Sequence, residues 1–286
     1  MNSRQALRAM VDARRGALVP GAFNALSARV IADLGFEAIY VSGAGVTNMH
    51  LGLPDQAFMG LAEIAEHTSR IRDAVELPLI VDADTGFGNA LNVRQTMRVL
   101  ERAGADCVQL EDQVNPKRCG HFSGQAVIDT AEMVGKIKAA VDARRDADLL
   151  VMARTDARTV YGFESAIERA QAFAEAGADL LFVEAPQTAE EIRALPQRLQ
   201  PPQLINMVIG GKTPIVSARE LGECGYAIVL YANAALQGAL VGMQRALTVL
   251  RETQRLDEDP SLVAAFAERQ RLVGKPALDE LEKRYT

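Results

Sequence analysis

The chain has 286 residues, of which 49% are hydrophobic and 24% charged, and its formal net charge is −6. This length suits a single domain with a large core, and the mild acidity argues against nucleic acid or an anionic membrane surface as a partner. Three scattered cysteines form no disulfide framework, and the sequence carries neither a signal peptide nor a long apolar span, so we expect one cytoplasmic domain over residues 1–286.

Eight short apolar runs, taken in chain order, predict eight strands that are buried on both faces. Several of them follow a helical stretch that ends in glycine, as at Gly35, Gly104, Gly177 and Gly225, and glycine in that place is typical of a helix end. The runs cover residues 17–23, 38–43, 78–84, 107–112, 149–156, 180–184, 203–208 and 227–231.

Helical patterns lie between these strands, for example at residues 92–103 and 164–176. Eight alternating strands and helices predict a (β/α)8 TIM barrel, and an open doubly wound sheet is the alternative. Residues 236–251 are interpreted as the last barrel helix. Residues from about 255 to 286 predict extra C-terminal helices, with Ser261 as a candidate N-cap. This segment either packs on a neighbouring subunit or folds back on its own barrel.

Acidic side chains stand at the ends of the predicted strands, where the active site of an α/β barrel lies. Asp82 and Asp84 are two residues apart, so on one strand they share a face, and Glu111 ends the next strand. Three converging carboxylates repel one another unless a cation lies among them. Oxygen ligands without a His–Cys pair favour Mg²⁺, or Mn²⁺, over Zn²⁺. The alternative is that each acid caps a helix or is solvated.

Further polar side chains end the strands that follow. Arg154 ends an apolar strand, and its guanidinium needs an anion. That anion is either a substrate carboxylate, held through two hydrogen bonds, or a neighbouring acid such as Asp156. Glu184 and Asn206 end the next two predicted strands, so they belong to the same candidate site.

A polar loop follows the fourth predicted strand. It carries one thiol, Cys119, among Lys117, Arg118 and His121, and these neighbours should lower the pKa of the thiol. A loop that bears a reactive group at a barrel mouth can act as a lid. The alternative is an ordinary surface loop with an incidental thiol.

These segments resemble the isocitrate lyase / phosphoenolpyruvate mutase superfamily from about residue 20 to residue 231. The block Lys117-Arg118-Cys119-Gly120-His121 resembles the K-[KR]-C-G-H signature of isocitrate and 2-methylisocitrate lyases, which is a highly specific motif. Three further matches are residues 82–88 and 111–113, which resemble metal-binding segments, and 42–44, which resembles the segment that holds a substrate carboxylate. Residues 206–214 are most similar to the 2,3-dimethylmalate lyase and petal death protein group.

The resemblance implies a barrel whose eighth helix is swapped between subunits, usually in a homotetramer. It implies that Asp84 binds Mg²⁺ directly and that Asp55, Asp82 and Glu111 are reached through water. The implied substrate carboxylate binders are Ser42, Gly43, Ala44, Arg154 and Asn206. The thiol at position 119 favours the lyase branch over members that act on carbon–phosphorus bonds.

The resulting hypothesis is a Mg²⁺-dependent carbon–carbon lyase that cleaves a 2-hydroxy di- or tricarboxylate of the 2-alkylmalate or methylisocitrate type. Retro-aldol (Claisen-type) chemistry would give an α-keto acid and a second carboxylate, with Tyr40 as a candidate base and Cys119 protonating the carbanion. The candidate catalytic residues are Cys119, Tyr40, Lys117, His121, Arg154 and Glu184. The alternatives are an oxaloacetate decarboxylase or hydrolase, a carboxyphosphonoenolpyruvate phosphonomutase-type enzyme and a non-catalytic metabolite-binding barrel.

Overall fold

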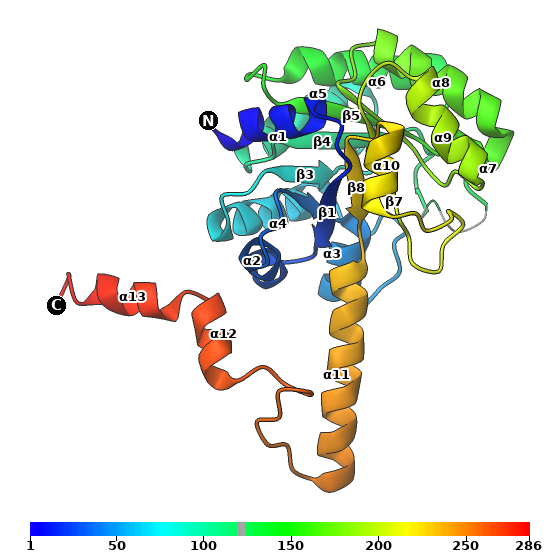
Figure 1. The fold of residues 1–286 in the computed structure, drawn as a ribbon. Helices are drawn as coiled ribbons and strands as arrows, with labels where there is room; N and C mark the ends of the chain where they lie inside the picture. Colours follow the sequence, from blue (N-terminus) through cyan, green and yellow to red (C-terminus); the bar gives the residue numbers. More distant parts are fainter. Residues whose placement is uncertain (119, 121–123) are drawn as a thin grey trace.

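The computed structural model describes residues 1–118, 120 and 124–286. Its eight strands form one closed barrel in which all neighbours are parallel and β8 pairs with β1 (Figure 1). The strands are β1 Ala17–Ala22, β2 Ile39–Val41, β3 Leu79–Asp82, β4 Cys107–Glu111, β5 Leu150–Thr155, β6 Leu180–Val183, β7 Gln203–Asn206 and β8 Ile228–Tyr231. The closure confirms the predicted (β/α)8 barrel and excludes the open sheet.

Helices cover the outside of the barrel and pack on the outward-facing strand residues (Figure 1). The helices are α1 Ser3–Asp12, α2 Ala25–Asp33, α3 Gly43–Leu51, α4 Leu61–Ala74, α5 Ala90–Arg102, α6 Thr130–Ala143, α7 Ala157–Tyr161, α8 Phe163–Glu175, α9 Ala189–Arg198, α10 Ala218–Cys224, α11 Ala234–Thr253, α12 Phe266–Leu272 and α13 Lys275–Glu282. The predicted helices at 92–103, 164–176 and 236–251 correspond to α5, α8 and α11 within two residues at each end.

Helix α1 closes the N-terminal end of the barrel. Its buried side chains Leu7, Met10 and Val11 pack with the inward-facing strand residues in one apolar cluster. Burial of three such side chains is worth on the order of 5 kcal/mol. With this end filled, the polar strand ends at the opposite, C-terminal end form the open mouth of the barrel.

The turn after β3 differs from the prediction. The strand ends at Asp82, and Asp84 follows in a turn with a φ of 46°. The two acids therefore do not share one face of a strand, and the predicted spacing argument was wrong at this point. The turn nevertheless brings both carboxylates to one place, because a Cβ added to Gly43 would lie 3.0 Å from Oδ2 of Asp82 and 3.3 Å from Oδ1 of Asp84.

The C-terminal helices leave the barrel. Helix α11 projects away from it, and α12 returns to contact α2, where Arg271 forms an ion pair with Asp33 (Figure 1). Ser261 is not a helix cap, because α12 begins only at Phe266 and the Ser261 hydroxyl donates to Asp259 instead. Large apolar side chains of α11 are exposed in this single chain: Leu240, Val241, Met243, Leu247 and Leu250.

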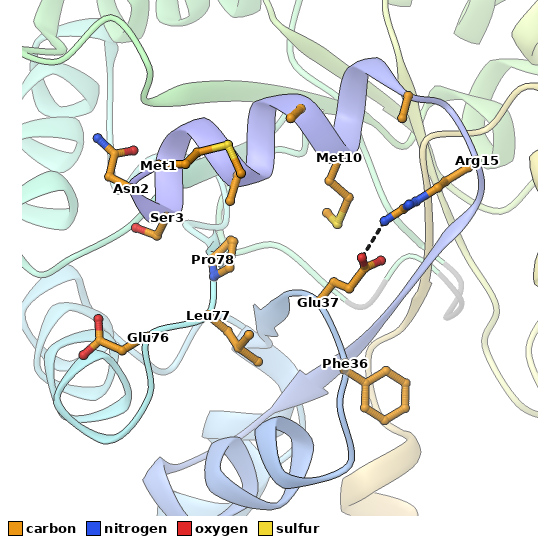
Figure 2. Close-up of a pocket in the computed structure, with 13 residues that line it drawn as sticks. Met1, Asn2, Ser3, Met10, Arg15, Phe36, Glu37, Glu76, Leu77 and Pro78 are labelled. Carbon is orange, nitrogen blue, oxygen red and sulfur yellow. Dashed lines mark hydrogen bonds and ion pairs between the residues drawn. The ribbon is translucent and has the colours of Figure 1, made fainter.

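A cavity of about 600 Å³ lies between α1 and the segments that precede β2 and β3 (Figure 2). Small and apolar side chains line most of it, and the ion pair of Arg15 with Glu37 stands at its edge. These segments lie at the N-terminal ends of the strands, so the cavity is separate from the polar mouth. Among the described helices, none combines the length and the apolar character that crossing a bilayer requires.

Candidate active site

A buried lysine joins two acids at the barrel mouth. Nζ of Lys117 lies 2.6 Å from Oδ1 of Asp55 and 2.9 Å from Oδ1 of Asp84. Burial alone would lower the pKa of Lys117, but these carboxylates outweigh it and raise the pKa well above the usual range, so the ammonium stays charged. Burial raises the pKa of Asp84 to about 7, although Lys117 opposes the shift.

Below this cluster, a chain of hydrogen bonds holds Asp82. Its Oδ1 accepts from Nε2 of Gln109 at 3.1 Å and from the backbone N–H of Asp84 at 3.1 Å. Oε1 of Gln109 in turn accepts from the Tyr40 hydroxyl at 2.9 Å. Burial and the Asp82 charge raise the pKa of Tyr40 well above 10, so its phenol is a poor general base. The sequence analysis missed Gln109, although a carboxamide inside an apolar strand was a visible signal.

Several acidic oxygens at the mouth meet no donor other than a cationic side chain among the described residues. Oδ1 of Asp84 lies 2.9 Å from Lys117, Oε2 of Glu111 lies 3.2 Å from Arg154, and Oε1 of Glu111 is buried without a described hydrogen-bond partner. Buried charged oxygens of this kind fit a divalent cation, and the all-oxygen set fits Mg²⁺ or Mn²⁺. Among the described residues, no three Asp, Glu, His or Cys side chains converge on one point. A cation here would therefore keep several water ligands, as Mg²⁺ commonly does.

Arg154 is surrounded by acids. Its Nε and Nη2 donate to Asp156 at 2.9 and 2.8 Å, while Nη1 lies 3.2 Å from Glu111 and Nη2 lies 3.4 Å from Glu184. The salt bridge to Asp156, which was the alternative to a substrate clamp, is therefore present. It occupies the Nε edge of the guanidinium, and Glu111 and Glu184 lie against Nη1 and Nη2, so a substrate anion that binds Arg154 would share these nitrogens with the acids.

Asp112 positions this arginine through Asp156. One oxygen of Asp112 accepts from the Thr155 hydroxyl at 2.7 Å and from Arg169 at 3.1 Å, and the other accepts from the Asp156 N–H at 3.0 Å. Burial raises the pKa of Asp112 to about 6. The network fixes the backbone that carries the acid partner of Arg154.

The loop after β4 lies over the mouth. The carboxamide of Gln113 binds both backbone groups of Arg118, accepting from its N–H at 3.0 Å and donating to its carbonyl at 2.8 Å. A Cβ on Gly120 would lie 2.6 Å from Nη2 of Arg154 and 2.5 Å from Cγ of Glu184, so the loop backbone touches the site directly. Cys119 and His121, which the sequence predicts as catalytic, lie outside the described residues.

Three predicted carboxylate binders, Ser42, Gly43 and Ala44, lie at the start of α3, beside Asp82 and Asp84. Ser42 caps α3, where its Oγ accepts from the Gly45 N–H at 3.0 Å and lies 3.4 Å from Oδ1 of Asn233. Gly43 and Ala44 therefore form the first turn of a helix, and a helix N-terminus attracts anions. Oδ1 of Asn206 is buried without a hydrogen-bond partner.

A cavity of about 480 Å³ opens beside these residues. Ala44, Asp55 and Asn233 line it together with residues 208–212 of the loop after β7. The structure thus brings together Asp55, Asp84 and Lys117 in one cluster and Glu111, Arg154 and Glu184 in a second. Tyr40 reaches neither cluster directly and is joined to Asp82 only through Gln109.

Comparison with known proteins identifies this arrangement. The family model described as phosphoenolpyruvate phosphomutase matches residues 7–251. The 2,3-dimethylmalate lyase of Eubacterium barkeri is 41% identical over 285 residues, which cover 100% of this chain and 99% of the relative. The 2-methylisocitrate lyase of Aeropyrum pernix is 48% identical over 246 residues, which cover 86% of this chain and 78% of the relative.

Solved structures agree with the sequence comparison. A crystal structure of 2,3-dimethylmalate lyase superposes with a TM-score of 0.94 at 33% identity and covers 100% of this chain and 96% of its own. Oxaloacetate acetylhydrolase with 3,3-difluorooxalacetate gives 0.93 at 31% identity, with 99% and 97% covered. Phosphonopyruvate hydrolase with oxalate and Mg²⁺ gives 0.89 at 31% identity, with 100% and 99% covered. The chain belongs to the phosphoenolpyruvate mutase/isocitrate lyase superfamily and, within it, to the carbon–carbon lyases.

Proposed function

We propose that this lyase uses Mg²⁺ to cleave a 2-hydroxy dicarboxylate of the 2-alkylmalate type into an α-keto acid and a second carboxylate. The observation that carries the proposal is the group of buried acidic oxygens on Asp84 and Glu111 that, among the described residues, meet no donor other than Lys117 and Arg154. The extent of the likeness to 2,3-dimethylmalate lyase, over the whole chain, favours the alkylmalate over the tricarboxylate methylisocitrate.

The metal is proposed to bind Asp84 directly and to reach Asp55, Asp82 and Glu111 through water. When bound, Mg²⁺, or Mn²⁺ in its place, would supply Lewis-acid stabilisation to the substrate hydroxyl oxygen as negative charge develops on it. Asp82 fits a water-mediated role, because its Oδ1 is already taken by two protein donors. Lys117 holds Asp55 and Asp84 at the same edge of the site.

The remaining residues are proposed to bind the substrate and to stabilise the negative charge that develops on it. The first turn of α3, with Ser42, Gly43 and Ala44, and the amide of Asn206 are proposed to hold one substrate carboxylate. Arg154 stabilises negative charge that develops on the leaving fragment. Its guanidinium is held in place by Asp156, with Glu184 beside it.

The loop after β4 is proposed to supply the final proton. Cys119 would protonate the carbanion, with His121 beside it in the same block. Gly120 already contacts the Arg154 and Glu184 side chains, which supports a position of this loop over the reacting atoms. We propose Tyr40 as a hydrogen-bond donor within the site rather than as the base, because its pKa is raised by burial.

We further propose a cytoplasmic homotetramer in which another copy of the chain covers α11. The support is the row of exposed apolar side chains along α11, which includes Leu240, Met243 and Leu247. Apolar surface of this extent on one helix is typical of a subunit interface. Sedimentation equilibrium measures the oligomeric state, and a stable monomer would contradict the proposal.

The activity is tested with a panel of 2,3-dimethylmalate, 2-methylisocitrate and oxaloacetate in the presence of Mg²⁺. Keto-acid release from the first two is read by coupled reduction, and oxaloacetate loss is read by its ultraviolet absorbance. We expect the highest kcat/KM with 2,3-dimethylmalate and no turnover by Asp84→Ala. Turnover of oxaloacetate alone would favour a hydrolase like the oxaloacetate acetylhydrolase neighbour, and full activity in excess EDTA would refute the metal.

A further inference from the structure

Gln109 is a carboxamide in the apolar interior of the barrel. It lies on β4 with a fully buried side chain, and its Cα is in register with Asp82 on β3. Met152 on β5, in register with Gln109, is apolar, and so are Ile80 and Cys107, two residues earlier on β3 and β4. Burial of an amide among such residues costs free energy unless its hydrogen-bonding groups find partners. Both Oε1 and Nε2 of Gln109 have hydrogen-bond partners, and these hydrogen bonds offset the cost of burial.

The two partners fix which way the carboxamide points. The Asp82 carboxylate can only accept, so Nε2 of Gln109 must face it, at 3.1 Å. Oε1 then faces the Tyr40 hydroxyl, which donates to it at 2.9 Å. A flipped amide would place its oxygen against the carboxylate. Only this orientation of the Gln109 carboxamide satisfies both partners, so its Nε2 group stays directed at Asp82.

This donor decides which oxygen of Asp82 is presented to the mouth. Oδ1 is held by Gln109 from below and by the Asp84 N–H from the side, both at 3.1 Å. Oδ2 is directed to the space at Gly43, where the Gly43 N–H at 3.4 Å is the only donor that the described residues supply to it. That space is shared with Oδ1 of Asp84, the proposed direct metal ligand.

We propose that Gln109 is a positioning residue of the cation site, which orients Asp82 so that Oδ2 faces the water ligands of the metal. The inference rests on the Mg²⁺ site of the proposed function. Gln109 does not touch the cation or the substrate and acts through Asp82. Partners of direct metal ligands typically change metal affinity about 10–100-fold when they are removed, and because Gln109 acts through Asp82 and a water, we expect the lower end of that range.

The test is calorimetric titration of Mg²⁺ into the full chain and its variants. Gln109→Met keeps the side-chain length and removes both hydrogen bonds, and we expect it to weaken Mg²⁺ binding at least about tenfold. The matched control is Gln203→Met on β7, because Gln203 is also buried but donates only to the backbone carbonyls of Leu199 and Pro201. We expect its Mg²⁺ affinity to equal that of the unmodified chain, whatever happens to its thermal midpoint.

A double-mutant cycle separates positioning from a general loss of structure. Asp82→Asn should weaken Mg²⁺ binding by itself, and adding Gln109→Met to it should change the affinity by less than about twofold. Unchanged Mg²⁺ affinity in Gln109→Met, or full additivity with Asp82→Asn, would overturn the inference while leaving the metal site intact. Failure of the unmodified chain to bind Mg²⁺ would overturn the metal site itself.

A second variant decides the question if Gln109→Met does not fold. Gln109→Glu keeps the shape and can still accept from Tyr40, but it places an oxygen where Asp82 now receives a donor. We expect it to lower Mg²⁺ affinity as Gln109→Met does, with a far-ultraviolet circular dichroism spectrum like that of the unmodified chain. Affinity at the level of the unmodified chain would overturn the inference.

Discussion

The ion pairs of Lys117 allow a direct test of how the mouth balances its charge. The ammonium lies 2.6 Å from Asp55 and 2.9 Å from Asp84, and its side chain is only 2% exposed. Lys117→Met keeps most of the side-chain volume and removes the charge. The buried carboxylates of Asp55 and Asp84 are then left without the cation that joins them.

The expected magnitude follows from burial. Removing one partner of a buried ion pair typically costs about 3–5 kcal/mol, because the remaining charge stays desolvated. In a chain of this size, each kcal/mol lowers the thermal midpoint by about 2–4 °C. Mg²⁺ can take over the role of the ammonium, so saturation at about 100 times its Kd should return about 2.7 kcal/mol. Lys117→Met should therefore be fragile in EDTA and largely restored by Mg²⁺.

Thermal unfolding in EDTA and in saturating Mg²⁺ measures both effects. The matched control is Lys136→Met, because the Lys136 side chain is also buried but its Nζ donates to the neutral carbonyl of Thr85 at 3.1 Å. This control should lose less stability and show the same Mg²⁺ effect as the unmodified chain. A Lys117→Met midpoint within about 2 °C of the unmodified chain in EDTA, corresponding to a loss below about 1 kcal/mol, would refute the reasoning.

Three further predictions concern the metal and the loop. The pKa of Asp84 is raised to about 7, so below pH 7 Mg²⁺ must displace a proton. Its affinity should fall about tenfold per pH unit, which calorimetry in buffers of different ionisation enthalpy measures. Gln113→Met loses two hydrogen bonds to Arg118, about 2 kcal/mol, so tryptic cleavage after Lys117 or Arg118 should be at least tenfold faster. Cys119→Ala should still bind Mg²⁺ and pyruvate while kcat falls about 10²–10⁴-fold.

The barrel could be predicted because its strands are continuous apolar runs. A strand covered on both faces leaves a signal in the sequence itself, and each of the eight runs became a strand. The acids at the strand ends could be predicted as well, because the end of each apolar run marks the C-terminal end of a strand. Helix α1 was not predicted. Leu7, Met10 and Val11 have helical spacing, but the charged residues between and around them make this apolar pattern weak in the sequence.

Contacts between distant segments could not be predicted from local patterns. Lys117 and Asp55 are 62 residues apart, and neither local sequence indicates that the two side chains meet. Asp84 has a positive φ although it is neither glycine nor asparagine, so strand periodicity was applied two residues beyond the end of β3 at Asp82. The partner of Arg154 was left open, because the strand pattern does not show whether a substrate anion or a neighbouring acid such as Asp156 meets the guanidinium.

Charge explains why these separate features belong to one site. Within the described part of the mouth, five carboxylates pair with the cations Lys117 and Arg154, and a sixth, Asp82, lies beside them. The five paired acids are Asp55, Asp84, Glu111, Asp156 and Glu184. A dicarboxylate substrate would add two more negative charges to this excess. A buried excess of this size is not compatible with anion binding unless a cation enters first or protons are taken up. The charge of the proposed metal, or protons taken up by acids such as Asp84, would make the mouth able to receive the substrate.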